Sequence, residues 1–149
     1  MELKTRLGED YKAALRAGDK LRVSVIRLLT ALIKNREVEK RAPLTDGEVM
    51  QAISTSCKQR QEAIEQYRQG GRQDLVEKEA AELAILQSYL PAALTGEELR
   101  VMVTEAILEV QATSLKEMGK VMAVLMPKVT GRADGKVVNT LVREVLSKN

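Results

Sequence analysis

The segment SYLPAALTGEEL, residues 88–99, decides how the chain is divided. Pro91 has no backbone N–H and disfavours a helical conformation in the residue before it, so it predicts the end of a helix. Thr95 and Glu98 have the spacing of a capping box, in which a Thr hydroxyl and a Glu carboxylate satisfy free backbone donors at a helix start. A short linker is therefore expected between Pro91 and Thr95. Two subdomains are predicted on either side of it, residues 1–91 and residues 92–149.

Before this junction, apolar residues recur at helical spacing. Four of them lie on one face of a first helix: Leu3, Leu7, Tyr11 and Leu15. Gly18 predicts the end of that helix, and Asp19 is placed to cap the next one. The second helix carries a wide apolar stripe from Leu21 to Ile33. We expect the charged run 34–41, followed by a proline, to end it.

The same signals predict two further helices before the junction. A second capping box, Thr45 to Glu48, begins a third helix, which ends at the Gly70-Gly71 pair. A fourth helix is expected from about Asp74 to the proline at the junction. The first subdomain is thus predicted to contain four helices.

After the junction the pattern predicts a three-helix bundle. The first of its helices follows Thr95, and a third capping box is predicted between Ser114 and Glu117. Gly131 is expected to end the middle helix, and Asp134 to cap the last one. No segment shows the alternation of a strand, so the predicted fold class is all-α.

Composition limits the chemistry that the chain can carry. There is no histidine, and Cys57 is the single cysteine, so neither a zinc site nor an internal disulfide can be assembled. Tryptophan and phenylalanine are absent, which disfavours binding of bases on an aromatic platform. We therefore expect no catalytic residues, no metal and no cofactor. Because the first residues are charged and no apolar run could span a bilayer, we also expect a cytoplasmic protein without membrane contact.

The charges are unevenly distributed along the chain. Residues 1–41 carry 11 basic and 6 acidic side chains, and residues 116–149 carry 7 and 3, giving +5 and +4. Residues 42–91 carry 5 and 8, and residues 92–115 carry 1 and 4, giving −3 each. The basic ends are either ordinary solvated helix faces or a patch for a polyanion.

The segment KVTGRADGK, residues 128–136, is the densest group of small and basic residues. It is not a Walker A loop, because its glycines enclose three residues and no Ser or Thr follows the final lysine. A turn between two helices explains the glycines. That turn would bring Lys128, Arg132 and Lys136 to the N-terminus of the last helix, where free N–H groups favour a phosphate.

Three other groups of residues are interpreted as structural. Glu77, Glu79 and Glu82 could suggest a Mg²⁺ site or an acid–base pair, but solvated helix surface is the simpler interpretation. Three methionines at helical spacing indicate core filling, with an adaptable partner surface as the alternative. They are Met118, Met122 and Met126. Cys57 is expected to be buried and inert.

Three stretches resemble the YqeY family. They are RVSVIRLLTALIKN (22–35), EKEAAELAILQSYLPAALTGEEL (77–99) and MGKVMAVLMPKVTGRADGKVVNTLVREVL (118–146). The last stretch also resembles the C-terminal tail of GatB, a subunit of the tRNA-dependent amidotransferase. This resemblance implies a helical tail that engages tRNA away from the chemistry. The catalytic portion of GatB has no counterpart in the chain, so the resemblance implies a binding surface and not a reaction.

The resulting functional expectation is an accessory tRNA- or RNA-binding module related to the amidotransferase. Its phosphate contacts are predicted at five cations: Lys120, Lys128, Arg132, Lys136 and Arg143. An alternative is a helical adaptor that binds the amidotransferase or an aminoacyl-tRNA synthetase through a methionine-containing groove. A third alternative, an amide-transferring enzyme, lacks the side chains that such chemistry needs.

Overall fold

A computed structural model describes residues 2–148, and it is all-helical over that range. Seven α-helices and one 3-10 turn account for its regular structure, and no strand occurs among the described residues. Backbone contacts divide the chain into two compact units, residues 1–90 and residues 91–149. The predicted all-α fold class is confirmed.

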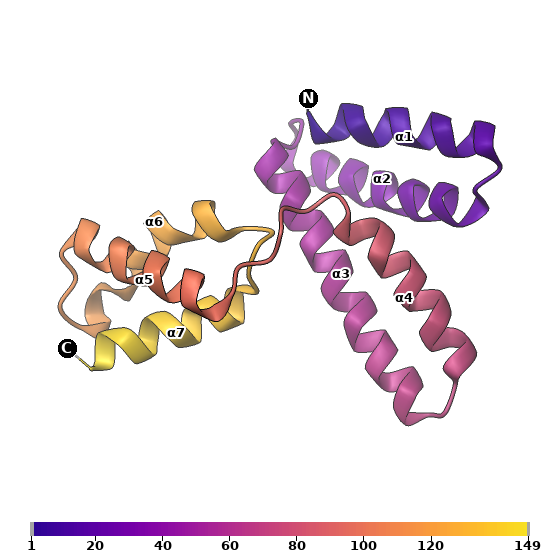
Figure 1. Cartoon of the computed structure of the whole chain (residues 1–149). Helices are drawn as coiled ribbons and strands as arrows, with labels where there is room; N and C mark the ends of the chain where they lie inside the picture. Colours follow the sequence, from indigo (N-terminus) through magenta and orange to yellow (C-terminus); the bar gives the residue numbers. More distant parts are fainter. Residues whose placement is uncertain (1, 149) are drawn as a thin grey trace. The chain divides into compact units, whose positions relative to one another are not determined.

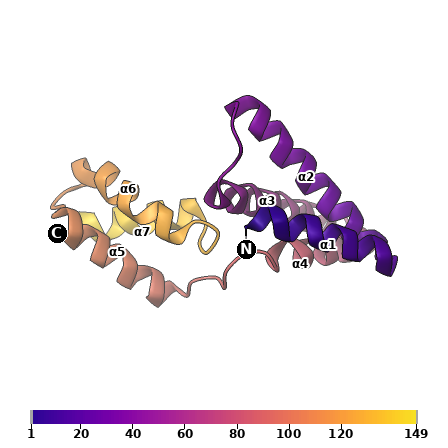
Figure 2. The same cartoon turned by 90° about the horizontal axis from the view of Figure 1, so that it is seen from above.

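Four helices build the N-terminal unit (Figure 1). They are α1 (Leu3–Ala17), α2 (Lys20–Lys40), α3 (Asp46–Gln69) and α4 (Gln73–Gln87). α1 packs along α2, and α3 and α4 form a long hairpin, as Figures 1 and 2 show from two directions. The buried centre of this unit is almost entirely aliphatic. Its fully buried side chains include Val25, Ile26, Val49, Ile53 and Leu86.

The predicted helix starts and stops in this unit are largely confirmed. Gly18 takes a left-handed conformation with φ of 69°, and the Asp19 carboxylate accepts a hydrogen bond from Arg22 N at 3.1 Å. Thr45 and Glu48 form both halves of a capping box. Because these caps need only residues within one turn of each other, the sequence suffices to predict them.

The second helix ends where the sequence predicts, within the charged run 34–41 that precedes Pro43. α2 continues through the charged run to Lys40, and Arg41 takes the left-handed conformation that ends it. Charged residues with long side chains favour helices, so most of the run is helical. The Glu37 carboxylate also accepts hydrogen bonds from Lys4 Nζ at 2.9 Å and from Leu44 N at 2.8 Å, which ties this last part of α2 to the rest of the unit.

Three helices build the C-terminal unit: α5 (Gly96–Val110), α6 (Met118–Val129) and α7 (Gly135–Ser147). They surround a separate aliphatic core. Its members of lowest exposure are Val103, Val121, Leu125, Val129, Val138 and Val142. The Thr95–Glu98 capping box at the start of α5 is confirmed.

The third predicted capping box, at Ser114, is wrong. Ser114 makes no side-chain cap, and a 3-10 turn (η1, Leu115–Glu117) follows it directly. Glu117 Oε1 instead accepts from Thr113, from both its backbone N (3.4 Å) and its hydroxyl (3.2 Å). The Glu117 carboxylate thus bonds to Thr113 and not to Ser114, the residue that the motif indicates. The reason is that the chain enters α6 through the tighter 3-10 turn.

Candidate functional site

The turn between α6 and α7 is held by hydrogen bonds to the start of the C-terminal unit. Gly131 has φ of 80°, which favours glycine at this position. Leu94 N donates to Arg132 O at 2.9 Å, and Arg132 Nε donates to Ala92 O at 3.2 Å. The predicted interhelical turn is confirmed, and the side chain of Arg132 is partly used to hold it.

A carboxylate occupies the start of α7, where a phosphate was expected. Asp134 Oδ1 accepts from Lys136 N at 2.9 Å and caps the helix. The cap uses a free N–H group and places a negative charge beside the positive end of the helix dipole. The Asp134 cap takes one of the donors that a phosphate at this helix end would use, and phosphate contact at this end of α7 stays a prediction.

The five predicted cations differ in their surroundings. Lys128 Nζ lies 3.5 Å from Glu109 Oε2 of α5 in an exposed pair, and Arg132 is partly buried in the turn. Lys120, Lys136 and Arg143 are exposed, and their side chains make no hydrogen bond or ion pair within residues 2–148. Of the three cations predicted to gather at this helix end, Lys128 is thus paired with a residue of α5 and Arg132 is used in the turn. Their common contact with a phosphate stays a prediction.

Lys136 and Arg143 share one side of α7. They are seven residues apart, which is close to two helical turns and roughly 10 Å of axial rise. The buried residues Val138, Val142 and Leu146 mark the opposite side of the helix. Both cations therefore point to solvent from one line along α7.

An open groove runs between α5 and α7 in the same unit. Its volume is about 600 Å³, and its apolar lining includes Leu99, Val137 and Leu141. Lys136 lies at its edge, and Arg100 and Glu144 approach each other to 3.8 Å across it. Methionines do not line this groove. Met118, Met122 and Met126 are half-buried against the core, which agrees with core filling.

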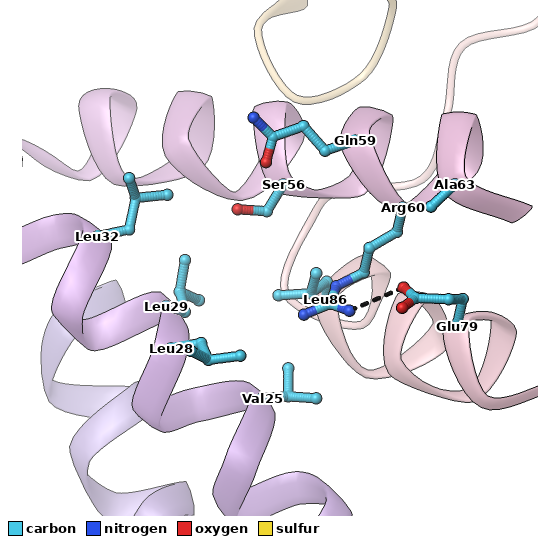
Figure 3. A pocket seen from close by; sticks show the side chains of 10 residues that line it. All are labelled: Val25, Leu28, Leu29, Leu32, Ser56, Gln59, Arg60, Ala63, Glu79 and Leu86. Carbon is cyan, nitrogen blue, oxygen red and sulfur yellow. Dashed lines mark hydrogen bonds and ion pairs between the residues drawn. The ribbon is translucent and has the colours of Figure 1, made fainter. Parts of the chain in front are cut away.

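The N-terminal unit contains an ion-pair cluster that sequence reasoning missed. Arg60 Nη1 of α3 pairs with Glu79 of α4 at 3.0 Å (Figure 3). The same atom also pairs with Glu82 of α4. Glu82 is only 8% exposed, so its predicted place on a solvated surface is wrong. The spacing of the glutamates along α4 could not reveal this, because their partner Arg60 lies on another helix. Glu77 is exposed, as predicted.

A second groove, of about 400 Å³, lies beside this cluster. One wall is formed by Val25, Leu28, Leu29 and Leu32 of α2, and the opposite wall by Ser56, Gln59 and Arg60 of α3 (Figure 3). Arg60 Nε is buried and has no hydrogen-bond partner. Cys57, close by on α3, is buried, and desolvation raises the pKa of its thiol, which opposes reactivity.

Neither a metal site nor a membrane-spanning helix is found among the described residues. Within residues 2–148, His, Cys, Asp and Glu side chains form no group of three or more that could hold a metal ion. None of the helices in the same range combines the length and apolarity that a membrane span requires.

Comparison with known proteins identifies the family. The family model described as "Yqey-like protein" matches residues 4–146. The chain belongs to the YqeY family. This match covers both helical units, so the α1–α4 unit and the α5–α7 unit are parts of one family architecture.

Curated relatives carry the name "Altered inheritance of mitochondria protein 41, mitochondrial". The protein of Pyrenophora tritici-repentis is 33% identical over 95% of this chain and 79% of its own length. The protein of Eremothecium gossypii is 34% identical over 72% of this chain and 60% of its own length. That of Kluyveromyces lactis is 34% identical over 87% of this chain and 68% of its own length.

These names contradict the expected cytoplasmic location, because the relatives are mitochondrial proteins. The expectation rested on the charged segment at residues 1–12, which lacks the apolar core of a secretory signal. Mitochondrial transit peptides are amphipathic and basic and do not need such a core. The absence of an apolar core therefore excludes a secretory signal at residues 1–12, but it does not bear on mitochondrial import.

Proposed function

We propose that the C-terminal unit binds the phosphate backbone of RNA as an accessory module without chemistry of its own. The observation that carries the proposal is the line formed by Lys136 and Arg143, two exposed cations without partners among the described residues. Lys120 adds a third such cation on α6. Lysine and arginine side chains that are free of internal ion pairs can replace condensed counterions on a nucleic-acid backbone.

The distribution of charge within the C-terminal unit favours RNA binding on one side of it. α5 carries the acidic residues Glu97, Glu98, Glu105 and Glu109. The unpaired cations lie on α6 and α7. RNA is therefore attracted to the α6–α7 side and repelled from α5. Lys128, which is already paired with Glu109, and Arg132, which holds the turn, make weaker contacts in this proposal.

The resemblance to the GatB tail supports tRNA as the form of RNA. Recognition depends on shape and charge, because the chain has three tyrosines and no other aromatic residue, and its C-terminal unit has none. The partner that acts on such a tRNA is, in this proposal, the amidotransferase or an aminoacyl-tRNA synthetase.

A tRNA titration at several salt concentrations tests the proposal. The variant Lys136→Glu/Arg143→Glu should bind more weakly, and each lost phosphate contact should flatten the slope of log affinity against log salt by roughly 0.7 to 0.9. Glutamate is compatible with the first turn of α7, so the fold should persist.

The matched control reverses two exposed cations of the other unit, Lys12→Glu/Lys78→Glu, and should bind nearly as the parent does. Lys4 and Arg6 are unsuitable controls, because Lys4 pairs with Glu37 and Arg6 stacks on Tyr89. If the α7 variant binds tRNA with the parent's affinity and salt slope, this surface is not used.

A further inference from the structure

The outward face of α2 has the pattern of one strand of a coiled coil without its partner. Residues on this face recur at alternating steps of four and three, the spacing of a heptad seam. They are Ser24, Leu28, Ala31, Asn35 and Val38, and all five are exposed. Leu28 and Val38 are 60% and 76% exposed, and they add apolar area to the face of α2 that its own unit leaves uncovered. We call these five residues the α2 seam.

A row of cations follows one edge of the α2 seam. Lys20, Arg27 and Lys34 recur every seven residues, so they lie on one line along the helix at steps of roughly 10 Å. The Lys20 and Lys34 side chains are exposed and form no hydrogen bond or close ion pair within residues 2–148, although the charge of Lys34 is felt by Glu37. The Arg27 side chain donates to the Tyr11 hydroxyl at 3.2 Å. In a coiled coil this row corresponds to a flanking position that selects the partner by charge.

The other edge of the α2 seam borders the 400 Å³ groove. Leu28 and Leu32 line it, opposite Ser56 and Gln59 of α3 (Figure 3). Beneath them, the buried Arg60 Nε lacks an acceptor. A helix lying on the α2 seam could place apolar side chains in this hollow, whereas a flat surface such as a bilayer would leave it unfilled.

We infer that the α2 seam and its groove are a docking site for an acidic amphipathic helix of another protein. The apolar side chains of that helix pack on Leu28 and Val38 and into the groove. Its acidic residues, repeated every seven positions on one edge, pair with the row Lys20, Arg27 and Lys34. Small side chains at Ser24 and Ala31 allow the two helices to approach closely.

Charge also argues against a second copy of this chain as the occupant. If two α2 helices paired in antiparallel fashion, the basic rows would face each other. In a parallel pair the basic row would face Val25, Leu32 and Glu39, and only Glu39 offers an opposite charge. The partner must therefore supply acidic residues that α2 lacks.

The test uses two synthetic peptides of four heptads with the same number of glutamates at the flanking positions. The first has leucine along its seam, and the second has serine there. We expect the leucine peptide to bind the full-length protein, to shift the backbone amide signals of α2 and of the groove wall on α3, and to weaken with salt. The serine peptide should not bind, which separates docking from attraction to any polyanion.

Two variants locate the site. Leu28→Glu/Val38→Glu removes the apolar contacts, and Lys20→Glu/Lys34→Glu reverses the row, so each should weaken binding of the leucine peptide by roughly tenfold or more. The controls make the same kinds of change outside the site, with Leu108→Glu at an exposed apolar position of α5 and Lys12→Glu/Lys78→Glu. These should keep the parent's affinity, and circular dichroism should show unchanged helicity for all variants.

Other outcomes would overturn the inference. The inference fails if the leucine and serine peptides bind equally well, or if the control variants lose as much affinity for the leucine peptide as the site variants do. It also fails if the amide shifts are confined to helices other than α2 and α3. Self-association of the parent that Val38→Glu abolishes would also overturn it, since a second copy would then cover the α2 seam. Binding of RNA or anionic vesicles at these residues without binding of the leucine peptide would assign the face to a different partner.

Discussion

Arg60 of α3 and Glu82 of α4 form an ion pair inside the N-terminal unit, with side chains only 17% and 10% exposed. The same guanidinium also binds Glu79 at 3.0 Å, so one cation serves two carboxylates. Glu82 sits one turn from Leu86, which is fully buried in the core. The pair therefore joins α3 and α4 at the point where their hairpin meets the aliphatic centre.

Replacement of Arg60 by methionine should strongly destabilise the protein. It leaves Glu82 buried without a cation, a change that typically costs about 3 kcal/mol or more of unfolding free energy. The double variant Arg60→Met/Glu82→Leu should recover part of the loss, because the more deeply buried carboxylate is removed and only Glu79, whose side chain is 20% exposed, is left without its cation. Urea unfolding of the parent, both single variants and the double variant measures this coupling.

The exposed pair Arg68–Glu65 provides the matched control. Its side chains are 61% and 57% exposed, so Arg68→Met should change the unfolding free energy by less than about 1 kcal/mol. A similar small effect for Arg60→Met would show that the buried pair contributes nothing special to the hairpin.

Tyr89 should ionise well above the ordinary tyrosine pKa of 10. Burial, together with its hydrogen bond to Asp10 Oδ2 at 2.5 Å and the charge of that carboxylate, raises the pKa of Tyr89 to about 12. The neutral phenol is favoured in the folded state, so its contribution to stability is complete below pH 10 and is lost between pH 10 and pH 12.

Absorbance of tyrosinate in the parent and in Tyr89→Phe checks this prediction. The difference between the two titrations should show a single ionisation near pH 12. If the ionisation removed by the substitution lies near pH 10, the value for an ordinary tyrosine, the phenol is not protected by its surroundings.

Glu48 should make the thermal stability sensitive to acid. Hydrogen bonds from Lys40 Nζ and from Thr45 N lower the pKa of Glu48 to about 2 from an ordinary value of 4.5. A carboxylate with a lowered pKa stabilises the fold above pH 4.5, and this contribution disappears as the pH falls toward 2.

Melting temperatures of the parent and Glu48→Gln across this acid range test the claim. The parent should melt at a higher temperature near neutral pH, and the difference should shrink as the pH approaches 2. Glu77→Gln, at an exposed position on α4, should show no such convergence. If the difference in melting temperature between the parent and Glu48→Gln stays constant with pH, the charge of this carboxylate does not contribute to stability.

The sequence by itself determined the features that depend on residues within one or two helical turns. Apolar spacing, the glycine stops at Gly18 and Gly131, and the caps at Thr45, Thr95 and Asp134 all act locally, so the helices could be predicted in order. It also placed the unpaired cations of α7 on one line, since helical geometry alone brings Lys136 and Arg143 to the same side.

Tertiary structure decided which of those charged residues are free. Glu82 looks like surface in the sequence and is buried because Arg60 reaches it from another helix. Lys128 looks like a phosphate ligand and is paired with Glu109, nineteen residues away. The exposure of Leu28 and Val38 likewise depends on which side of α2 the neighbouring helices cover. The sequence sets where a side chain lies on its own helix. Its partners lie on other helices, and they meet it only when those helices pack together.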